Sequence, residues 1–385
     1  MKICIVTTNR ADYGLLRPVL REIAKQENLS AELVVTGAHL LQSAGMTISE
    51  IQHDNFPIAA EIPMFAEPSG TDSHAEAVSE GLRKFDAYFR KTKPDCVMVL
   101  GDRFELFSIV LPAFLAGIPI VHLCGGDMTL GAIDESIRHA VTKLSTLHFV
   151  TNAESERHVL QLGEQPDRVF NVGHTAIDNL NDMTLMNRAD LSRELSVSFK
   201  ALNILMTFHP ETYADDRGVK ALRNTLSVLG DLQDTGIFIT GSNNDPGFED
   251  FRTEVARFVK ANSNASFFSS LGTYKYFSLM AQVDVVVGNS SSGLMEVPYF
   301  KIPTIDIGNR QQGRLRGNSI IHSDGSPESL RRALDEALNF NRDVIKNPYG
   351  EGGAAEKIAA IMNGFAETGI ATKKEWFIPK ALRPE

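Results

Sequence analysis

Residues 285–296 of this chain read VVVGNSSSGLME. The β-branched run at the start indicates a buried parallel strand, and the small hydroxyl residues after it open a helix. Backbone N–H groups at a helix N-terminus, beside the hydroxyls of Ser290 and Ser291, form a receptor for phosphate. Glu296 suits a ribose, whose two hydroxyls can donate to one carboxylate. Because no Lys-Ser/Thr pair follows the glycine, the stretch predicts a nucleotide-diphosphate loop in an α/β fold and not a Walker-type site.

Composition limits the class of protein. The chain has 385 residues, 43% of them hydrophobic, which is enough for two domains with sizeable cores. Its formal net charge of −10, without a compensating basic stretch, argues against a nucleic-acid partner. The three cysteines, Cys4, Cys96 and Cys124, have no CxxC spacing, so neither a disulfide framework nor a structural zinc site is expected.

The same features predict a compartment. The N-terminal stretch Met1–Val6 is a strand too short for a signal peptide or a membrane span, and no later uncharged segment reaches spanning length. Sparse cysteines agree with a reducing environment. We therefore expect a cytoplasmic protein without a membrane partner.

Strand-like runs alternate with helical periodicity along the whole chain, which predicts an α/β protein with doubly wound parallel sheets. Between about 176 and 200 the pattern weakens into a polar helical stretch, which we interpret as an interdomain connection. We expect two Rossmann-like domains, residues 1–180 and 181–365, with the tail 366–385 packed back on the first. The expected strands are Ile3–Val6, Glu32–Thr36, Cys96–Leu100, Ile118–Leu123, His148–Thr151, Val169–Val172, Asn203–Phe208, Ile237–Thr240, Ala265–Phe268, Asp284–Val287 and Thr304–Ile307. The expected helices include Leu15–Gln26, Ser73–Lys91, Glu105–Ala116, Ile133–Thr146 and Ala354–Phe365.

Polar and glycine-rich residues cluster where the predicted strands end. In parallel α/β sheets the carboxyl ends of the strands carry the ligand site, here expected in a cleft shared by the two domains. Structural glycines and charges would have no reason to favour one end of a sheet. The stretches concerned are Asn9–Tyr13, Gly101–Arg103, Gly125–Asp127, His209–Pro210, Gly241–Asn243, the Ser290 loop and Gly308–Arg310.

Arginines are the candidate diphosphate partners, because a guanidinium fork matches phosphate oxygens. Arg10 and Arg310 each follow a predicted strand, which favours a functional role over a solvated surface charge. Arg103 is a further candidate. Arg314 and Arg316 could instead bind a neighbouring subunit, so their role stays open.

His209 follows a strand and precedes Pro210, which fixes the direction of the backbone. A histidine beside a core strand is usually a satisfied structural residue, but a position facing acidic loops equally fits ligand binding or proton transfer. No His or carboxylate group has metal-ligand spacing such as HExxH, so no metal is expected.

Four carboxylates form the acidic candidate set: Asp102, Asp127, Asp134 and Glu135. Pairs four residues apart, Asp134 with Arg138 and Glu135 with His139, are explained by surface ion pairs worth about 0.3 kcal/mol each. Acids in the first turn of a helix also favour its dipole. The alternative is a carboxylate cluster facing an electron-poor sugar carbon, with one acid and one base. The adjacent Gly125-Gly126 pair, which lets backbone approach a ligand closely, favours that alternative.

Eight motifs occur in order along the chain. They are RADY (10–13), TGAHL (36–40), GDR (101–103), IDESIRH (133–139), FHPE (208–211), GSN (241–243), GNSSSG with EVP (288–293 and 296–298), and GNRQ (308–311). Together they resemble the hydrolysing UDP-N-acetylglucosamine 2-epimerase family of bacterial sialic-acid and legionaminic-acid biosynthesis. The resemblance covers nearly the whole chain and is weakest after Ala176 and in the tail.

The resemblance implies a GT-B-like architecture of two Rossmann-like domains, a UDP-sugar substrate in the cleft, and no cofactor. It assigns UDP binding to Arg10, Arg103, His209, Ser242, Asn243, Ser290, Ser291, Glu296 and Arg310. It assigns the sugar to His39, Asp102 and Arg138, and catalysis to Asp102, Asp127, Asp134, Glu135, Arg138 and His209. Non-hydrolysing relatives and the animal enzyme carry a glutamate at the position of Cys124. Either Asp127 takes over that role or the sugar pocket differs.

In the implied reaction UDP leaves as the C2 proton is removed, which gives a 2-acetamidoglucal. Water then adds with inversion at C2 and yields N-acetylmannosamine and UDP. Residues that stabilise charge on the departing UDP act in the transition state. The alternative substrate is UDP-2,4-diacetamido-2,4,6-trideoxyglucose (UDP-N,N'-diacetylbacillosamine). A non-hydrolysing epimerase, a GT-B glycosyltransferase and a non-catalytic UDP-sugar sensor are the competing functions, and the resemblance implies a homodimer or homotetramer.

Overall fold

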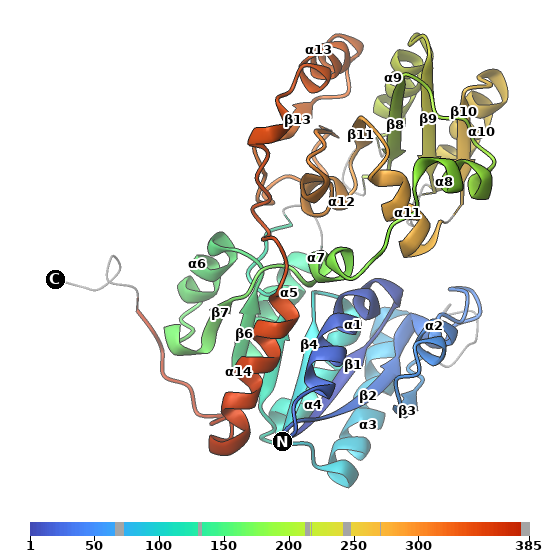
Figure 1. Cartoon of the computed structure of the whole chain (residues 1–385). Helices are drawn as coiled ribbons and strands as arrows, with labels where there is room; N and C mark the ends of the chain where they lie inside the picture. The colour runs from blue at the N-terminus through green and yellow to red at the C-terminus, as the bar shows by residue number, and fades with distance from the viewer. Residues whose placement is uncertain are drawn as a thin grey trace. The chain divides into compact units, whose positions relative to one another are not determined.

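The chain forms two compact units. The structure is a computed structural model that describes residues 1–65, 73–129, 133–211, 216, 218–241, 248–269 and 271–378. The N-terminal unit contains Met1–Met128, Ile133–Asn179 and the chain from Tyr349 onward, and the C-terminal unit contains Leu180–Pro348 (Figure 1).

The N-terminal unit is built on a seven-stranded parallel sheet with the order β3-β2-β1-β4-β5-β6-β7. Ile3 and Ile5 of β1 join the apolar core beneath α1 and α14, whereas Cys4 and Val6 join the core beneath α3 and α4. Both faces of the sheet are therefore covered, which explains why its central strands are hydrophobic without interruption. The strands are β1 (Lys2–Thr7), β2 (Ser30–Thr36), β3 (Ile58–Ile62), β4 (Cys96–Leu100), β5 (Ile120–Leu123), β6 (Leu147–Val150) and β7 (Val169–Asn171). The helices are α1 (Arg10–Ala24), α2 (Ile48–His53), α3 (His74–Thr92), α4 (Phe107–Leu115), α5 (Asp134–Leu144), α6 (Ala153–Gln161), α7 (Thr175–Asn181) and α14 (Ala354–Thr368), with 3-10 turns η1 (Gly37–Leu40), η2 (Phe104–Leu106) and η3 (Pro166–Arg168).

The C-terminal unit has a six-stranded parallel sheet with the order β10-β9-β8-β11-β12-β13. Its core joins the central strands to α9, α10 and α13. The strands are β8 (Leu202–Thr207), β9 (Thr235–Thr240), β10 (Ala265–Phe268), β11 (Val285–Gly288), β12 (Thr304–Ile307) and β13 (Ile320–Ser323). The helices are α8 (Arg188–Leu195), α9 (Val219–Gly230), α10 (Phe248–Ala261), α11 (Gly272–Met280), α12 (Ser292–Met295) and α13 (Pro327–Leu338), with 3-10 turns η4 (Val297–Phe300) and η5 (Arg342–Val344).

Both sheets follow the Rossmann order, in which the first and fourth strands are neighbours. The chain leaves those two strands in opposite directions, so their carboxyl ends form the ligand position of an open α/β sheet. In the N-terminal unit the two strands are β1 and β4, and in the C-terminal unit they are β8 and β11. The prediction of two doubly wound α/β halves is confirmed.

The last helix belongs to the N-terminal unit, whereas the sequence assigned residues up to 365 to the second domain. Ile358, Ala359 and Met362 of α14 pack in the same core as α1. The carboxylate of Asp178 accepts hydrogen bonds from the N–H groups of Ala354 (3.1 Å) and Ala355 (2.6 Å), which caps the start of α14. The apolar face of this helix is therefore buried against the N-terminal sheet.

Three other local expectations needed correction. Helix α1 begins at Arg10, not near Leu15, because Asn9 is its N-cap. Strands β3 and β13 were not predicted, since both lie at sheet edges and alternate between buried and less buried residues.

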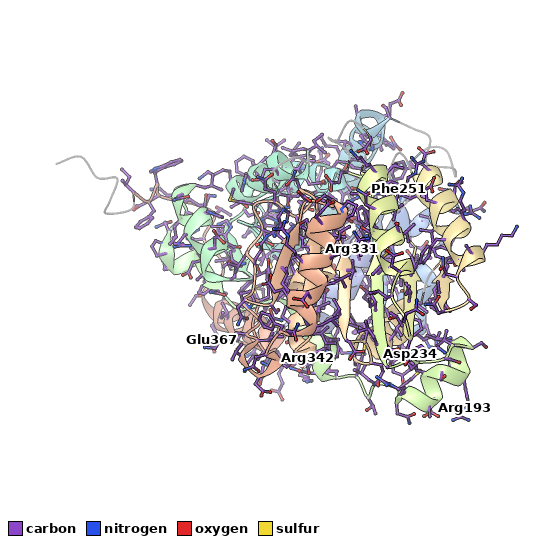
Figure 2. The ribbon with its side chains drawn as sticks, turned by 90° about the horizontal axis from the view of Figure 1, so that it is seen from above. Arg193, Asp234, Phe251, Arg331, Arg342 and Glu367 are labelled. Atoms are coloured by element: carbon purple, nitrogen blue, oxygen red, sulfur yellow. The ribbon has the colours of Figure 1, made fainter. Side chains whose placement is uncertain are left out.

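Several charged side chains of the C-terminal unit lie at its surface. Figure 2 shows Arg193, Arg331 and Arg342, and all three are exposed. Among the described residues, no helix is both long enough and apolar enough to span a membrane.

Candidate active site

The loop after β1 holds a buried carboxyl. Oδ1 of Asn9 accepts hydrogen bonds from the N–H groups of Ala11 (2.8 Å) and Asp12 (3.1 Å). The Asp12 carboxyl in turn accepts from the Thr8 hydroxyl and from Nδ2 of Asn9 (2.8 Å). Burial raises the pKa of Asp12 to about 7, because a charged carboxylate is poorly solvated there. A group that titrates near neutrality, at the switch point of the sheet, is a candidate proton carrier.

Arg10 opens α1 and lies at the surface. Its Nε is 3.1 Å from Oε1 of Glu50 on α2, and the two side chains are 42% and 45% exposed. An ion pair this exposed contributes little and is screened by salt. The guanidinium can therefore exchange Glu50 for a stronger anion at small cost.

Arg138 ties the loop after β4 to α5. Its side chain is only 2% exposed, and its Nη2 donates to the carboxylate of Asp102. Its Nη1 donates to Oε2 of Glu135 (3.0 Å) and to the backbone carbonyl of Asp127 (2.6 Å). The expected surface pair of Asp134 with Arg138 is replaced by this buried bridge, because α5 turns Arg138 toward β4. The expected pair of Glu135 with His139 is present, at 3.0 Å.

Asp134 lies beside this bridge, in the first turn of α5. Burial raises its pKa, the negative charge of Asp102 raises it further, and Arg103 opposes the change. Asp102 forms an ion pair with the Arg138 guanidinium, whereas the described residues show no such ion pair for Asp134. Two neighbouring carboxyls in such unlike surroundings suit the roles of acid and base.

Cys124 and Asp127 both follow β5. Cys124 occupies the position at which non-hydrolysing relatives carry a glutamate. The Asp127 carboxylate accepts hydrogen bonds from the hydroxyls of Thr151 (3.0 Å) and Ser155 at the start of α6. Cys124 adopts a left-handed backbone (φ +63°), and burial, followed by the charges of Asp127 and Asp102, raises the pKa of its thiol. The thiol is therefore neutral, and Asp127 is anchored to α6.

Arg103 and His39 have structural partners. The Arg103 guanidinium pairs with Glu105, with Nε 3.4 Å from Oε2, and Glu105 itself is 1% exposed. His39 is fully buried, with its ring nitrogens 3.0 Å from Oγ1 of Thr7 and 2.8 Å from Oγ1 of Thr47. Burial lowers the pKa of His39 to about 4. His39 is therefore held by Thr7 and Thr47, and its expected role at the sugar stays a prediction.

In the C-terminal unit, Asn289 holds the loop after β8. Its Oδ1 accepts from the N–H of His209 (2.7 Å), and its Nδ2 donates to the His209 carbonyl (2.8 Å). Its own carbonyl accepts from Nε2 of Gln311 (2.8 Å) and Nη1 of Arg310 (3.2 Å). Burial and the nearby Arg310 lower the pKa of His209 to about 3, so the imidazole is neutral. Arg310, His209 and the serine loop are thus gathered at one switch point.

The serine loop departs from the expected helix. Helix α12 is a single turn, Ser292–Met295, followed by η4, so the N-terminal dipole of a long helix is not available. Gly288 at the end of β11 has φ +141°, and a Cβ there would lie 1.9 Å from the Thr207 carbonyl oxygen. Only glycine fits this position, and it leads the chain directly into Ser290 and Ser291.

Glu296 and Arg314 carry buried atoms that lack a partner. Within the described residues, neither Oε2 of Glu296 nor Nε of Arg314 has a hydrogen-bond partner. Burial raises the pKa of Glu296. Buried polar atoms are normally satisfied, so this pair marks a place where a polar ligand would complete the structure. Ser242 and Asn243, also assigned to UDP, lie outside the described residues.

Comparison with known proteins decides the family. Residues 21–363 match the family model described as UDP-N-acetylglucosamine 2-epimerase. The chain belongs to this epimerase family. It is 40% identical over 324 residues to the Campylobacter jejuni protein named GDP/UDP-N,N'-diacetylbacillosamine 2-epimerase (hydrolyzing), with 84% of each chain covered. It is 33% identical over 381 residues to the Escherichia coli polysialic acid biosynthesis protein P7, covering 98% of this chain and 97% of that protein.

Solved epimerase structures share the fold. The Methanocaldococcus jannaschii UDP-GlcNAc 2-epimerase in complex with UDP-GlcNAc and UDP has a TM-score of 0.75 at 19% identity, over 94% of this chain and 100% of that chain. A Staphylococcus aureus structure with UDP has a TM-score of 0.77 at 18% identity, over 98% of this chain and 100% of that chain. The predicted GT-B-like fold class is confirmed.

The motifs of this epimerase include most of the polar residues at the two switch points. They do not single out three further residues, Asp12, Asn289 and Arg314. Asp12 belongs to the RADY motif, but nothing in its spacing marks it as a buried carboxyl. Asn289 belongs to the serine loop, and Arg314 is an arginine whose role the sequence leaves open. The buried atoms of these residues, and not their spacing, make them further candidates for the site.

Proposed function

We propose that this chain is a hydrolysing UDP-sugar 2-epimerase that converts UDP-N-acetylglucosamine and water to N-acetylmannosamine and UDP. The observation that carries the proposal is the pair of unlike carboxyls, Asp102 bound to Arg138 and Asp134 with a raised pKa. They lie together at the switch point of the N-terminal sheet. Family membership supports the same reaction class.

The C-terminal unit is proposed to hold UDP. Arg310 and the serine loop contact the diphosphate, and neutral His209 supplies a hydrogen bond without adding charge. The ribose hydroxyls donate to Oε2 of Glu296, which lacks a partner among the described residues. Solved relatives that contain UDP or UDP-GlcNAc support this assignment.

The N-terminal unit is proposed to act on the sugar. The C1–O bond breaks and its electron pair leaves with UDP, while a carboxylate takes the C2 proton and the C1=C2 bond of the glycal forms. Water then adds its oxygen to C1, and a proton returns to C2 from the opposite face. Because the C2–H is weakly acidic, loss of UDP runs ahead of proton loss, so groups that stabilise the leaving diphosphate lower the barrier. The Asp102 carboxylate stabilises positive charge at C1, and Asp134 and Asp12 are placed to exchange protons.

UDP-N,N'-diacetylbacillosamine is the second candidate substrate. The observation that favours it is the 40% identity to the Campylobacter jejuni relative of that name. A 31% identical Legionella pneumophila protein, matched over 94% of this chain, is named for the same nucleotide. Cys124, where other relatives carry glutamate, is consistent with a different sugar pocket.

A side-by-side rate measurement tests the proposal. Purified protein is incubated with each nucleotide without an acceptor, and the products are followed by NMR. We expect free UDP and the free 2-epimeric sugar from at least one nucleotide, and the larger kcat/KM identifies the substrate. Recovery of a UDP-linked epimer, or turnover only when an acceptor is added, would contradict the proposal. We also infer a homodimer or homotetramer, which light scattering in solution would test.

A further inference from the structure

The tail after α14 is fastened to the N-terminal unit, although it has no helix or strand in its described part. Arg168 donates from Nη1 to the Ala371 carbonyl (2.8 Å) and from Nη2 to the Lys373 carbonyl (3.0 Å). The N–H of Phe377 donates to the Gly163 carbonyl (2.9 Å). A Cβ at Gly163 would lie 2.6 Å from the Trp376 indole, so the ring rests directly on this glycine. The described part of the tail therefore packs at a defined position against Gly163 and Arg168, which we call its seat.

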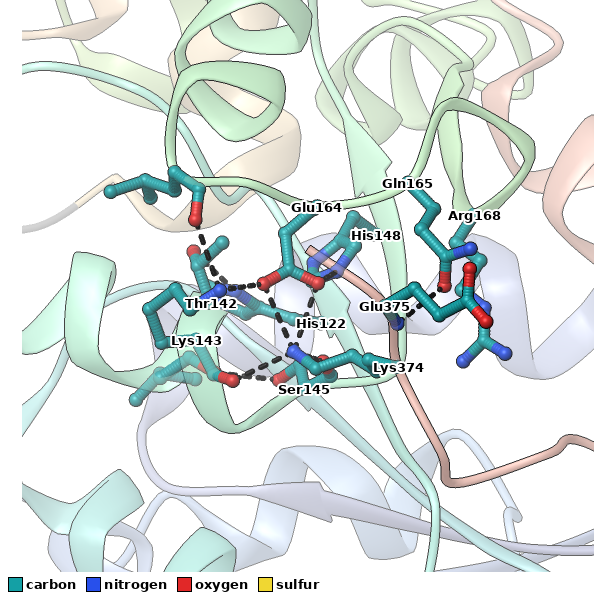
Figure 3. A network of polar contacts seen from close by, with 12 residues as sticks. His122, Thr142, Lys143, Ser145, His148, Glu164, Gln165, Arg168, Lys374 and Glu375 are labelled. Atoms are coloured by element: carbon teal, nitrogen blue, oxygen red, sulfur yellow. Dashed lines mark hydrogen bonds and ion pairs between the residues drawn. The ribbon is translucent and has the colours of Figure 1, made fainter. Parts of the chain in front are cut away.

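Lys374 points inward from this seat (Figure 3). Its ammonium group donates to the carbonyls of Lys143 and Ser145, both at 2.7 Å, at the end of α5. It also donates to both carboxylate oxygens of Glu164, at 3.0 and 2.9 Å. A cation at the C-terminal end of a helix is stabilised by the helix dipole. Lys374 thus holds the end of α5 opposite to the end that carries Asp134 and Arg138.

Glu164 is the buried centre of a group that we call the Glu164 cluster: Lys143, His148, Glu164 and Lys374. The Glu164 side chain is 1% exposed, with Nζ of Lys143 at 2.6 Å and Nε2 of His148 at 3.1 Å. Burial opposes ionisation of this carboxyl, but hydrogen bonds from His148, Lys143 and Lys374 prevail and lower its pKa to about 2. Removing one cation from such a group leaves buried polar atoms unpaired, which is costly.

The Glu164 cluster adjoins a second histidine that reaches the candidate active site. His148 on β6 is the register partner of His122 on β5. Nε2 of His122 is 2.8 Å from the Gly101 carbonyl, directly before Asp102, and Nδ1 is 3.2 Å from Oγ1 of Thr142. Thr142 Oγ1 donates to the Arg138 carbonyl (2.9 Å). His122 therefore supports the Asp102 side of the bridge through the Gly101 carbonyl. Its ring also lies against Thr142 of α5, whose hydroxyl hydrogen goes to the Arg138 carbonyl.

We propose that Lys374 is a positioning residue: by closing the Glu164 cluster, the tail fixes α5 and β5 so that Arg138 holds Asp102 in its reactive position. The inference rests on the proposed function for its kinetic consequence, but not for its structural one. Among the described residues, Lys374 contacts Glu164 and the carbonyls of Lys143 and Ser145, and not Asp102 or Asp134. Its effect passes along α5, from the seat of the tail to the first turn of the helix.

Hydrogen exchange read by mass spectrometry tests the structural step in the full-length protein. We expect Lys374→Gln to raise exchange about tenfold or more in peptides covering 101–104 and 134–139, which carry the Asp102–Arg138 bridge. The matched control is Lys373→Gln, which removes the same charge from an exposed neighbour and should change neither peptide. Faster exchange confined to 143–145 and 163–165 would overturn the proposal. Should Lys374→Gln fail to fold, Trp376→Ala loosens the same tail and is judged by the same peptides.

Kinetics test the consequence for catalysis. We expect Lys374→Gln to lower kcat per UDP-binding site about tenfold or more, with KM and UDP affinity within about twofold, and Lys374→Arg to restore most of kcat. A merely stabilising tail would instead lower the melting temperature and leave kcat per UDP site unchanged, which would overturn the proposal. If the wild-type protein releases no UDP from either nucleotide, the proposed function fails, and the exchange result still decides whether the tail braces α5.

Discussion

At the scale of single residues, three carboxyls share the switch point of the N-terminal sheet but differ in their surroundings. Asp102 is bound by the buried guanidinium of Arg138, Asp134 is half-buried beside that negative charge, and Asp12 is buried among hydroxyl and amide donors. An elimination needs one carboxylate that stays charged near C1 and another group that can take and return a proton. The contacts of these residues supply both.

The first prediction concerns Asp102. Asp102→Asn keeps the size of the side chain but removes the charge that pairs with Arg138 and faces the developing positive charge at C1. We expect kcat to fall by about 100-fold or more, with UDP affinity within about threefold, because the lost interaction is made in the transition state. UDP release and calorimetry with UDP measure the two quantities. Asp190→Asn, at an exposed carboxylate on α8, is the control, and a wild-type rate for Asp102→Asn would refute the assignment.

The second prediction concerns Asp12 and pH. Its pKa of about 7 in the native protein lies above the value of about 3.9 for an unfolded aspartate. Between these values the native state binds more protons than the unfolded state, so the free energy of unfolding falls as pH rises, by at most about 1.4 kcal/mol per pH unit. Asp12→Asn removes this contribution. Urea unfolding at pH 5, 6 and 7 should give a difference in the free energy of unfolding, Asp12→Asn minus wild type, that rises with pH, because a contribution that falls with pH has been removed. The same difference for Asp190→Asn should stay constant, and a constant difference for Asp12→Asn would contradict the account.

The sequence located candidate residues better than it located their partners. Short motifs place Asp102 and Arg310 directly after strands, where the carboxyl ends of a parallel sheet carry the ligand site, and they place Asp134 at the start of a helix. The partner of Arg138 could not be inferred, since Asp102 is 36 residues away and a nearer acid, Asp134, offers the usual helical spacing.

At the scale of elements, the serine loop depends on how β11 ends. Gly288 allows the backbone to pass the Thr207 carbonyl, and the chain then turns through Ser290 into the single turn α12. The strand was predictable from its β-branched run. The shortness of α12 was not predicted: the turn passes into η4, which contains Pro298 and ends at Lys301 in a left-handed conformation.

The third prediction concerns this turn. Gly288→Ala places a Cβ 1.9 Å from the Thr207 oxygen and forces alanine into φ +141°. We expect a loss of at least about 3 kcal/mol of stability, or a protein that does not fold. Gly364→Ala is the matched control: this glycine lies within α14, with no atom within 4 Å of the added Cβ. It should stabilise the protein by about 0.5–1 kcal/mol in urea unfolding. Equal stability of the two variants would contradict the description of β11.

Element boundaries show the limits of sequence patterns. Helix α14 was predicted correctly as a helix but assigned to the wrong half, because its apolar face does not reveal which sheet it covers. The edge strands β3 and β13 lack a continuous buried run, so nothing in their composition separated them from loops.

At the scale of the whole molecule, binding and chemistry are assigned to different units. We propose that the ribose partner and most diphosphate partners come from the C-terminal unit, with Arg10 and Arg103 of the N-terminal unit as further diphosphate candidates, and that the carboxyls of the N-terminal unit act on the sugar. Substitutions of the UDP-contacting residues should therefore weaken UDP binding, whereas substitutions of the carboxyls should lower kcat, as expected for residues without shared partners.

The fourth prediction tests this division. Glu296→Gln replaces a carboxylate that we expect to accept from ribose hydroxyls, and each hydrogen bond to a charged group is worth about 1.5–3 kcal/mol. We expect UDP to bind about 10-fold to 100-fold more weakly by calorimetry, with turnover at saturating substrate much less affected than in Asp102→Asn. Glu194→Gln, at an exposed glutamate paired with Lys275, should bind UDP normally. Unchanged UDP affinity in Glu296→Gln would place the ribose elsewhere.

One isotope measurement tests most directly whether the protein eliminates UDP and hydrates the product. The reaction is run in heavy water with the preferred nucleotide, and the released sugar is examined by NMR and mass spectrometry. The account predicts free UDP and an equal amount of free 2-epimeric sugar that carries one carbon-bound deuterium, at C2. Released sugar without deuterium at C2, or with its original C2 configuration, would contradict it.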